Sequence, residues 1–89
     1  MGLTIWKYPL RIKDDPTLSM PAGARVLCVQ VQGDQPMVWA MVDPLKPTEV
    51  RRFRLAGTGH PIDTDPGRYV GTFQAHNGAL VFHLFESPR

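Results

Sequence analysis

The chain has 89 residues, of which 43% are hydrophobic and 20% charged. This length fits one domain spanning residues 1–89, and this composition is that of a globular protein rather than a disordered one. The formal net charge of +2 is too small to indicate a nucleic-acid-binding protein. The single cysteine, Cys28, excludes an intrachain disulfide and a multi-cysteine zinc site. With no apolar run near the roughly 18 residues of a membrane span and no signal-peptide pattern, we expect a cytoplasmic protein without a membrane partner.

Short β-prone segments alternate with turns rich in proline and glycine along the whole chain. The expected strands cover residues 3–8, 17–20, 25–32, 37–42 and 50–55, and a final hairpin covers residues 68–85. No segment shows the 3.6-residue apolar period of an amphipathic helix. The sequence therefore predicts an all-β protein, a single small antiparallel sandwich or barrel of six to seven short strands.

The final hairpin is the clearest signal, because Asn77-Gly78 suits the two positive-φ positions of a type I′ turn. The pairs that this turn predicts are His76–Ala79, Gln74–Val81, Phe73–Phe82, Thr72–His83 and Val70–Phe85. One face of the hairpin is then apolar, and the other mixes polar and apolar side chains. The mixed face is too apolar for a solvated surface and too polar for a core, so we predict that it is an interface. The predicted interface residues are Gln74, Val81, His83 and Phe85.

The hairpin over residues 25–42 carries apolar residues on both faces. The expected faces are Leu27, Val29 and Val31 against Val26 and Cys28. A tight turn at Gly33-Asp34 places Cys28 opposite Trp39, whereas a longer loop shifts the register by one residue. In either register the hairpin has more apolar surface than one small sandwich covers. This surplus predicts a homo-oligomer, most simply a two-fold dimer.

Residues 44–60 form the one concentrated basic region, with four basic side chains and one acidic side chain. Arg52 and Arg54 project from one strand face about 6.6–7 Å apart, a spacing suited to one or two phosphates. In the glycine-rich loop that follows, Thr58 and His60 are candidate donors to the same ligand. The candidates for stacking on a base are Trp39 and Tyr69. The alternative interpretation is a solvated strand face followed by a structural glycine turn.

The sequence offers no convergent catalytic or metal-binding set. None of the three histidines follows a metal-ligand spacing. Cys28 lies between apolar neighbours, which is typical of a buried, unreactive thiol. Asp63 and Asp65 lie in an Asp-Thr-Asp-Pro-Gly segment that is typical of a turn. We therefore expect a protein that is not an enzyme and that uses no metal and no cofactor.

Several strings of the chain resemble a family of small uncharacterised proteins of bacteriophages, prophages and bacteria, a domain of unknown function. The strings are Ile5-Trp-Lys-Tyr-Pro9, Val38-Trp-Ala-Met-Val-Asp43, Phe53-Arg54, Gly57-Thr-Gly-His-Pro-Ile62, Tyr69-Val-Gly-Thr-Phe-Gln74 and Leu80-Val-Phe-His-Leu-Phe-Glu86. The resemblance covers nearly the whole chain and implies a phage-type accessory protein. Such proteins include inhibitors of host defences and oligomeric traps for nucleotide signals, so the functional class follows by analogy alone.

Together these observations predict a non-enzymatic, oligomeric accessory protein that binds a ligand. The leading hypothesis is that it sequesters an anionic, nucleotide-like signal and so counters host defence. The alternative is a protein-interaction module, either an inhibitor of a host enzyme or a small virion component, that uses the mixed face of the final hairpin.

Overall fold

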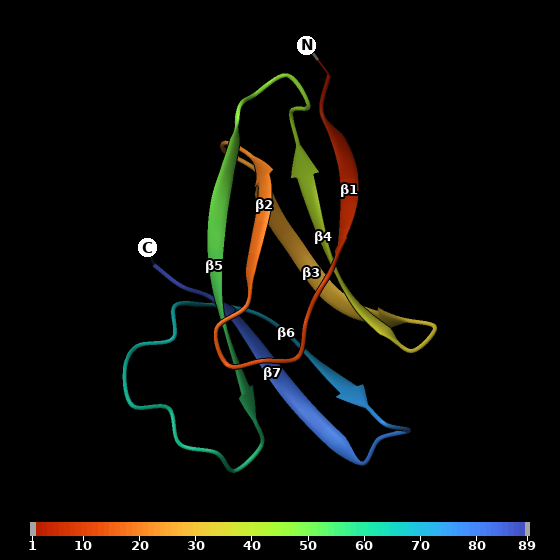
Figure 1. The fold of residues 1–89 in the computed structure, drawn as a ribbon, viewed down its shortest axis with the longest axis vertical. Coiled ribbons are helices and arrows are strands. Elements are labelled where there is room, and N and C mark those ends of the chain that lie inside the picture. Colours follow the sequence, from red (N-terminus) through yellow and green to blue (C-terminus); the bar gives the residue numbers. More distant parts are fainter. Residues whose placement is uncertain (1, 89) are drawn as a thin grey trace.

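The computed structural model describes residues 2–88 and contains seven strands and no helix over that range (Figure 1). The strands are β1 (Thr4–Pro9), β2 (Thr17–Pro21), β3 (Arg25–Gln32), β4 (Gln35–Val42), β5 (Thr48–Gly57), β6 (Arg68–Ala75) and β7 (Leu80–Glu86). The predicted all-β fold is confirmed. Between residues 2 and 88, nothing helical is long and apolar enough to cross a membrane.

The strands form two antiparallel sheets that pack face to face. A three-stranded sheet has the order β1-β4-β3, and a four-stranded sheet has the order β2-β5-β7-β6. Of the two architectures that the sequence left open, the structure is a sandwich and not a closed barrel. The chain crosses from one sheet to the other between β1 and β2, between β2 and β3, and between β4 and β5, as expected of a small sandwich.

The core lies between the sheets, and the inward-facing residues of the strands form it. On β4, Val38, Ala40 and Val42 are buried while the residues between them are half-buried. Phe53 and Leu84, on the four-stranded sheet, are also buried and belong to the same hydrophobic cluster. Full burial of a valine, leucine or phenylalanine side chain stabilises a fold by about 1.5–3 kcal/mol, so these inward-facing residues stabilise the packing of one sheet on the other.

The two sheets approach most closely where β3 packs against β6. A Cβ built on Gly71 would lie 2.9 Å from Val29 Cγ1, so only glycine fits at this position without displacement of the Val29 side chain. Next to it, Arg68 Nη2 donates a hydrogen bond of 3.3 Å to the carbonyl oxygen of Val26. This corner ties the two sheets together along one side of the sandwich.

The β3–β4 hairpin has the tight turn, with Gln32 opposite Gln35 and Cys28 opposite Trp39. Strand β4 therefore begins two residues earlier than the expected residue 37. A bulge lies between Val26 and Cys28 and breaks the alternation. The prediction that Leu27 and Val29 share a face is wrong for this reason. Val26 and Val29 are both buried in the core, whereas Leu27 is exposed.

The β6–β7 hairpin has the predicted register near its turn. The confirmed pairs are Gln74–Val81, Phe73–Phe82 and Thr72–His83. The predicted pair Val70–Phe85 is wrong, because a bulge between Tyr69 and Gly71 shifts the register and places Tyr69 opposite Phe85. Val70 instead packs against the core, and Tyr69 occupies the outward position that was predicted for Val70.

Candidate binding face

The outer face of the four-stranded sheet brings together most of the residues singled out in the sequence. Strand pairing and alternation place them on β5, β7 and β6 and at the start of the loop 58–67. The face comprises Arg52, Arg54, Thr58, Tyr69, Thr72, Gln74, Val81, His83 and Phe85. Two sets predicted separately, the ligand-binding residues and the interface residues, thus largely share one surface, which we call the outer β5–β7–β6 face.

A row of three side chains crosses this face. Arg54 on β5 is opposite Phe85 on β7, and Phe85 is opposite Tyr69 on β6. The rings of Tyr69 and Phe85 are 5.7 Å apart between centroids and inclined by 61°, an edge-to-face contact. Tyr69 remains 55% exposed, so its ring is available to a ligand. The bulge in β6 produces this row, because without it Val70 would occupy the position of Tyr69.

A chain of hydrogen bonds runs beside the aromatic row. Thr58 Oγ1 lies 2.7 Å from His83 Nε2, and Thr72 Oγ1 lies 2.9 Å from His83 Nδ1. Thr72 Oγ1 also lies 2.6 Å from the hydroxyl of Tyr69. Both ring nitrogens of His83 therefore have a hydrogen-bond partner that fixes the ring, and the hydroxyls can donate or accept to suit either tautomer. Thr72 was absent from the predicted site, although its predicted pairing with His83 was the signal that would have found it.

The basic run divides between the two sides of β5. Arg54 lies on the outer face, where its Nη1 is 3.9 Å from Asp15 Oδ1, and its Nε is buried without a hydrogen-bond partner in residues 2–88. Arg52 lies on the same face and is exposed. Arg51 points toward the core side instead, where its Nη2 is 2.6 Å from Glu86 Oε2. Two of the three arginines are therefore available to a ligand, and the third belongs to the scaffold.

His60 does not join the arginines. Its backbone N–H donates a 3.0 Å hydrogen bond to the carbonyl oxygen of Gly57, and a Cβ built on Gly57 would lie 2.9 Å from His60 Nδ1. By alternation that Cβ would point to the same side of β5 as Phe53 and Leu55, away from Arg54. The glycine at position 57 lets the His60 ring fold back on the strand, so His60 contacts the scaffold rather than the outer β5–β7–β6 face.

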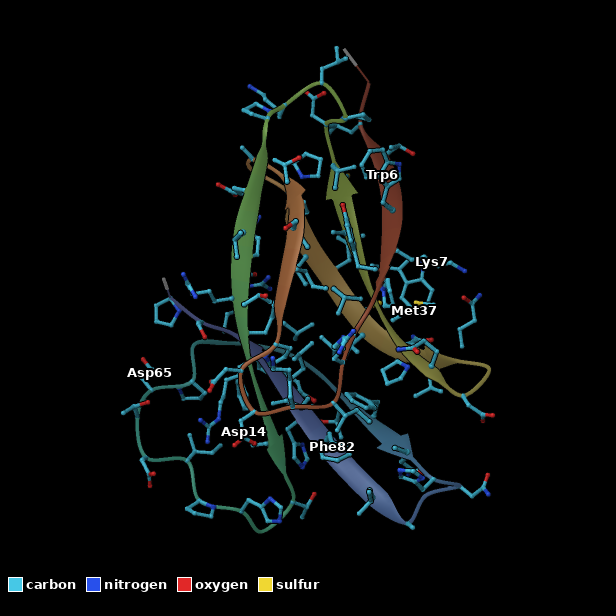
Figure 2. The ribbon with its side chains drawn as sticks, in the orientation of Figure 1. Trp6, Lys7, Asp14, Met37, Asp65 and Phe82 are labelled. Carbon is cyan, nitrogen blue, oxygen red and sulfur yellow. The ribbon has the colours of Figure 1, made fainter. Side chains whose placement is uncertain are left out.

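Trp39 lies in the other sheet. It is on β4, opposite Cys28 and Lys7, and it lines an apolar hollow of about 310 Å³ with Ile5 and Leu27. Lys7 pairs with Trp39, and Asp65 lies in the loop that follows β5, the strand of Arg54. Figure 2 shows Lys7 and Asp65 on opposite sides of the molecule. The core separates Trp39 from Arg54, so one small ligand cannot contact both residues. Of the two candidates for stacking, the geometry keeps Tyr69.

Comparison with models of protein families shows to which family the chain belongs. The model of a domain of unknown function, DUF7352, matches residues 1–89. The chain belongs to the DUF7352 family. No curated protein matches this DUF7352 chain, and no solved structure matches it either.

The outer β5–β7–β6 face of this DUF7352 protein combines charged, aromatic and hydrogen-bonding groups. It offers fixed positive charge from Arg52 and Arg54, an accessible aromatic ring from Tyr69, and hydroxyl and imidazole groups that are held in place by one another. Guanidinium groups pair with phosphates or carboxylates, and an exposed ring stacks on a planar group. The face therefore suits a ligand that has an anionic part and a flat part.

Proposed function

We propose that this DUF7352 protein is a non-enzymatic binding protein that holds an anionic, nucleotide-like ligand on the outer β5–β7–β6 face. The observation that carries the proposal is the row Arg54–Phe85–Tyr69 across three neighbouring strands. Adjacent strands are about 4.8 Å apart, so Arg54 and Tyr69 are about 10 Å apart across the sheet. One nucleotide spans such a separation, with its phosphate on the arginine and its base on the ring.

In this proposal, Arg52 and the row of hydrogen bonds from Thr58 to Tyr69 complete the site. Arg52 lies two residues from Arg54 on the same face and supplies a second guanidinium for a phosphate. The chain Thr58–His83–Thr72 ends on the hydroxyl of Tyr69 and fixes the position of the ring. A ring that is already held in place loses little conformational entropy when a base stacks on it, which favours binding.

The biological role that we propose follows from the resemblance to phage and prophage proteins. A cytoplasmic accessory protein that sequesters a nucleotide-like signal would counter a host defence that depends on that signal. Sequestration requires that the protein bind the signal without converting it. The charged and aromatic groups of the outer β5–β7–β6 face are suited to such binding.

The homo-oligomer is the second part of the proposal, and the outer face of the three-stranded sheet supports it. Ile5 and Leu27 are exposed there beside Trp39, and the bulge in β3 turns Leu27 outward. Apolar side chains clustered on a sheet surface are stabilised when a second copy covers them. A two-fold axis through this face would leave both copies of the outer β5–β7–β6 face free to bind.

Nucleotide titration followed by isothermal calorimetry and by 1H–15N spectra tests the proposed function. A panel of linear and cyclic nucleotides is compared with the matching nucleosides and with inorganic phosphate. We expect at least one nucleotide to bind, and Arg54→Gln and Tyr69→Leu each to weaken it about tenfold or more. Arg25→Gln, an exposed arginine on the other sheet, is the matched control and should leave the affinity unchanged.

A protein partner is the alternative ligand of the same face, favoured by the half-buried Val81 and Phe85 within it. If the folded protein binds no member of the nucleotide panel, the nucleotide proposal is wrong. Capture of a host protein that is lost in Phe85→Ala and retained in Arg25→Gln would then support the interaction module.

A further inference from the structure

A cavity of about 590 Å³ lies at one end of the sandwich, between the turn that joins β3 to β4 and the turn that joins β6 to β7. Both turns point to the same side of the molecule in Figure 1. Ile12, in the segment between β1 and β2, forms a third wall. Gln74 is the one residue shared with the outer β5–β7–β6 face, so the cavity is a separate feature of the molecule.

The apolar walls of the cavity belong to the unfilled end of the core. Val31 pairs with Pro36, and Pro36 is buried on the core side of β4. Val31 therefore faces the core side, yet it is 39% exposed, and Ile12 is 44% exposed. An apolar group that entered the cavity would remove from water surface that folding leaves exposed. A concave site of this size, with apolar walls at the mouth of a β fold, is typical of small-molecule sites.

The rim of the cavity is polar and carries a single charge. Asp34 is the one charged side chain among the described residues that line it. The side chains of Gln74, His76 and Asn77 add hydrogen-bonding groups around the same opening. A carboxylate attracts a cation and repels an anion, so the rim favours a positively charged group.

The rim also has an unusual backbone. His76 and Asn77 have φ values of 53° and 56°, the two non-glycine residues with positive φ between residues 2 and 88. At Asn77 this φ is the one that a type I′ turn requires, so the turn leaves only the φ of His76 unexplained, and strained backbone of that kind collects at binding sites. Both residues border the cavity.

We propose that this cavity binds a small organic cation, with a primary ammonium group on Asp34 and an apolar body of about one ring against Val31 and Ile12. This site takes a ligand of opposite charge to the proposed nucleotide, at a different place on the molecule. A negative result for one of the two proposals therefore leaves the other unaffected.

A matched pair of fragments tests the ligand class. The 15N-labelled full chain is titrated with phenethylamine and with 3-phenylpropionate, which share a ring and a short chain and differ in the sign of their charge. We expect phenethylamine to shift the amide signals of Gly33 and Gly78, with a dissociation constant of about 1–10 mM, as befits so small a ligand. We expect 3-phenylpropionate and ethylamine to bind about tenfold more weakly or worse. Equal binding of the two charged fragments, or no shift at Gly33 and Gly78, would overturn the proposal.

Two variants locate the site. Asp34→Asn removes the charge and keeps a residue suited to the turn, and we expect it to weaken phenethylamine binding about tenfold. Asp63→Asn, in the exposed loop 58–67, is the control and should bind as the original chain does. Val31→Phe places a ring in the cavity and should abolish binding while the remaining spectrum stays native. Unchanged binding in either Asp34→Asn or Val31→Phe contradicts the assignment.

Discussion

Arg51 and Glu86 form a largely buried ion pair on the core side of the β5–β7 sheet. Arg51 Nη2 lies 2.6 Å from Glu86 Oε2, and Arg51 Nε donates a 2.8 Å hydrogen bond to the same oxygen. Arg51 Nη1 donates another hydrogen bond of 2.8 Å to the carbonyl oxygen of Ala24, which precedes β3. Glu86 also accepts from Arg68, whose second bond reaches Val26 on β3. One carboxylate thus organises two arginines that hold the sheets together.

We predict that Glu86→Gln destabilises the fold by about 2 kcal/mol, because it leaves Arg51 without its charged partner in a half-buried place. Urea unfolding at neutral pH measures the loss. Glu49→Gln is the matched control, since Glu49 contacts the same arginine at 3.4 Å but is 45% exposed. That control should cost about 0.5 kcal/mol or less. Equal losses in the two variants would mean that the pair does not act as a structural link.

We predict that Gly71→Ala destabilises the fold by about 1–3 kcal/mol, because its Cβ would meet Val29 Cγ1 at 2.9 Å. The double variant Gly71→Ala with Val29→Ala removes the clashing methyl, so the two losses should be less than additive. A Cβ at Gly2 meets nothing within 4 Å, so Gly2→Ala is the control and should have no effect. Thermal unfolding of the four variants measures the coupling. Strict additivity would show that β3 and β6 do not limit each other here.

We predict a loss of stability at alkaline pH that depends on Tyr8. Its hydroxyl is buried without a hydrogen-bond partner in residues 2–88, and burial raises the pKa of Tyr8 above the ordinary value of 10.0. As the pH rises above 10.0, Tyr8 ionises in the unfolded chain while the folded chain keeps the proton, so the free energy of unfolding falls. The fall ends once the pH passes the pKa of the folded state.

Tyr8→Phe tests this dependence. The variant should be about as stable as the original chain at neutral pH, or up to roughly 1 kcal/mol more stable, because it removes a buried hydroxyl that has no partner. Its unfolding free energy should fall less steeply between pH 9 and pH 11, a range of about one unit on either side of the ordinary tyrosine pKa. Denaturant titrations at several pH values give both quantities. An identical alkaline slope in the two proteins would refute the buried-hydroxyl explanation.

We predict that the chain self-associates through the outer face of the three-stranded sheet. Sedimentation velocity should give twice the chain mass for the original protein and a single chain mass for Leu27→Lys, since a buried lysine without a partner opposes association. Leu45→Lys is the control, because Leu45 is 87% exposed and lies in the β4–β5 loop, outside the strands of this sheet. A well-folded original chain that sediments as a single copy at every concentration tested would end the dimer proposal.

Local patterns determined much of the fold. The Asn77-Gly78 turn and the alternation of the following strand correctly predicted the pairs Gln74–Val81, Phe73–Phe82 and Thr72–His83 of the final hairpin. The tight Gly33-Asp34 turn was one of two open alternatives and is the one observed. Turn chemistry acts between neighbouring residues, so one sequence suffices to read it.

The bulges could not be predicted in the same way. Leu27 and Val70 each break a regular alternation. A glycine inside a strand pattern suggests a bulge or a close approach of another strand, so Gly71 is a local signal beside Val70, whereas no glycine stands beside Leu27. Both bulges lie near the close contact between β3 and β6, where Gly71 meets Val29. The face predicted for Leu27 and the partner predicted for Phe85 were wrong because the prediction continued a regular alternation through each bulge.

The sequence by itself determined that this chain is all-β, where most of its strands run and that its arginines stand beside a glycine-rich loop, because period-two patterning and turn residues act locally. Only the tertiary structure decided that Arg54, Tyr69 and His83 share one face while Trp39 lies in the other sheet and His60 folds back on Gly57. Which sheet a strand joins and where it bulges depend on contacts between distant segments, and those contacts set which side chains a ligand can reach together.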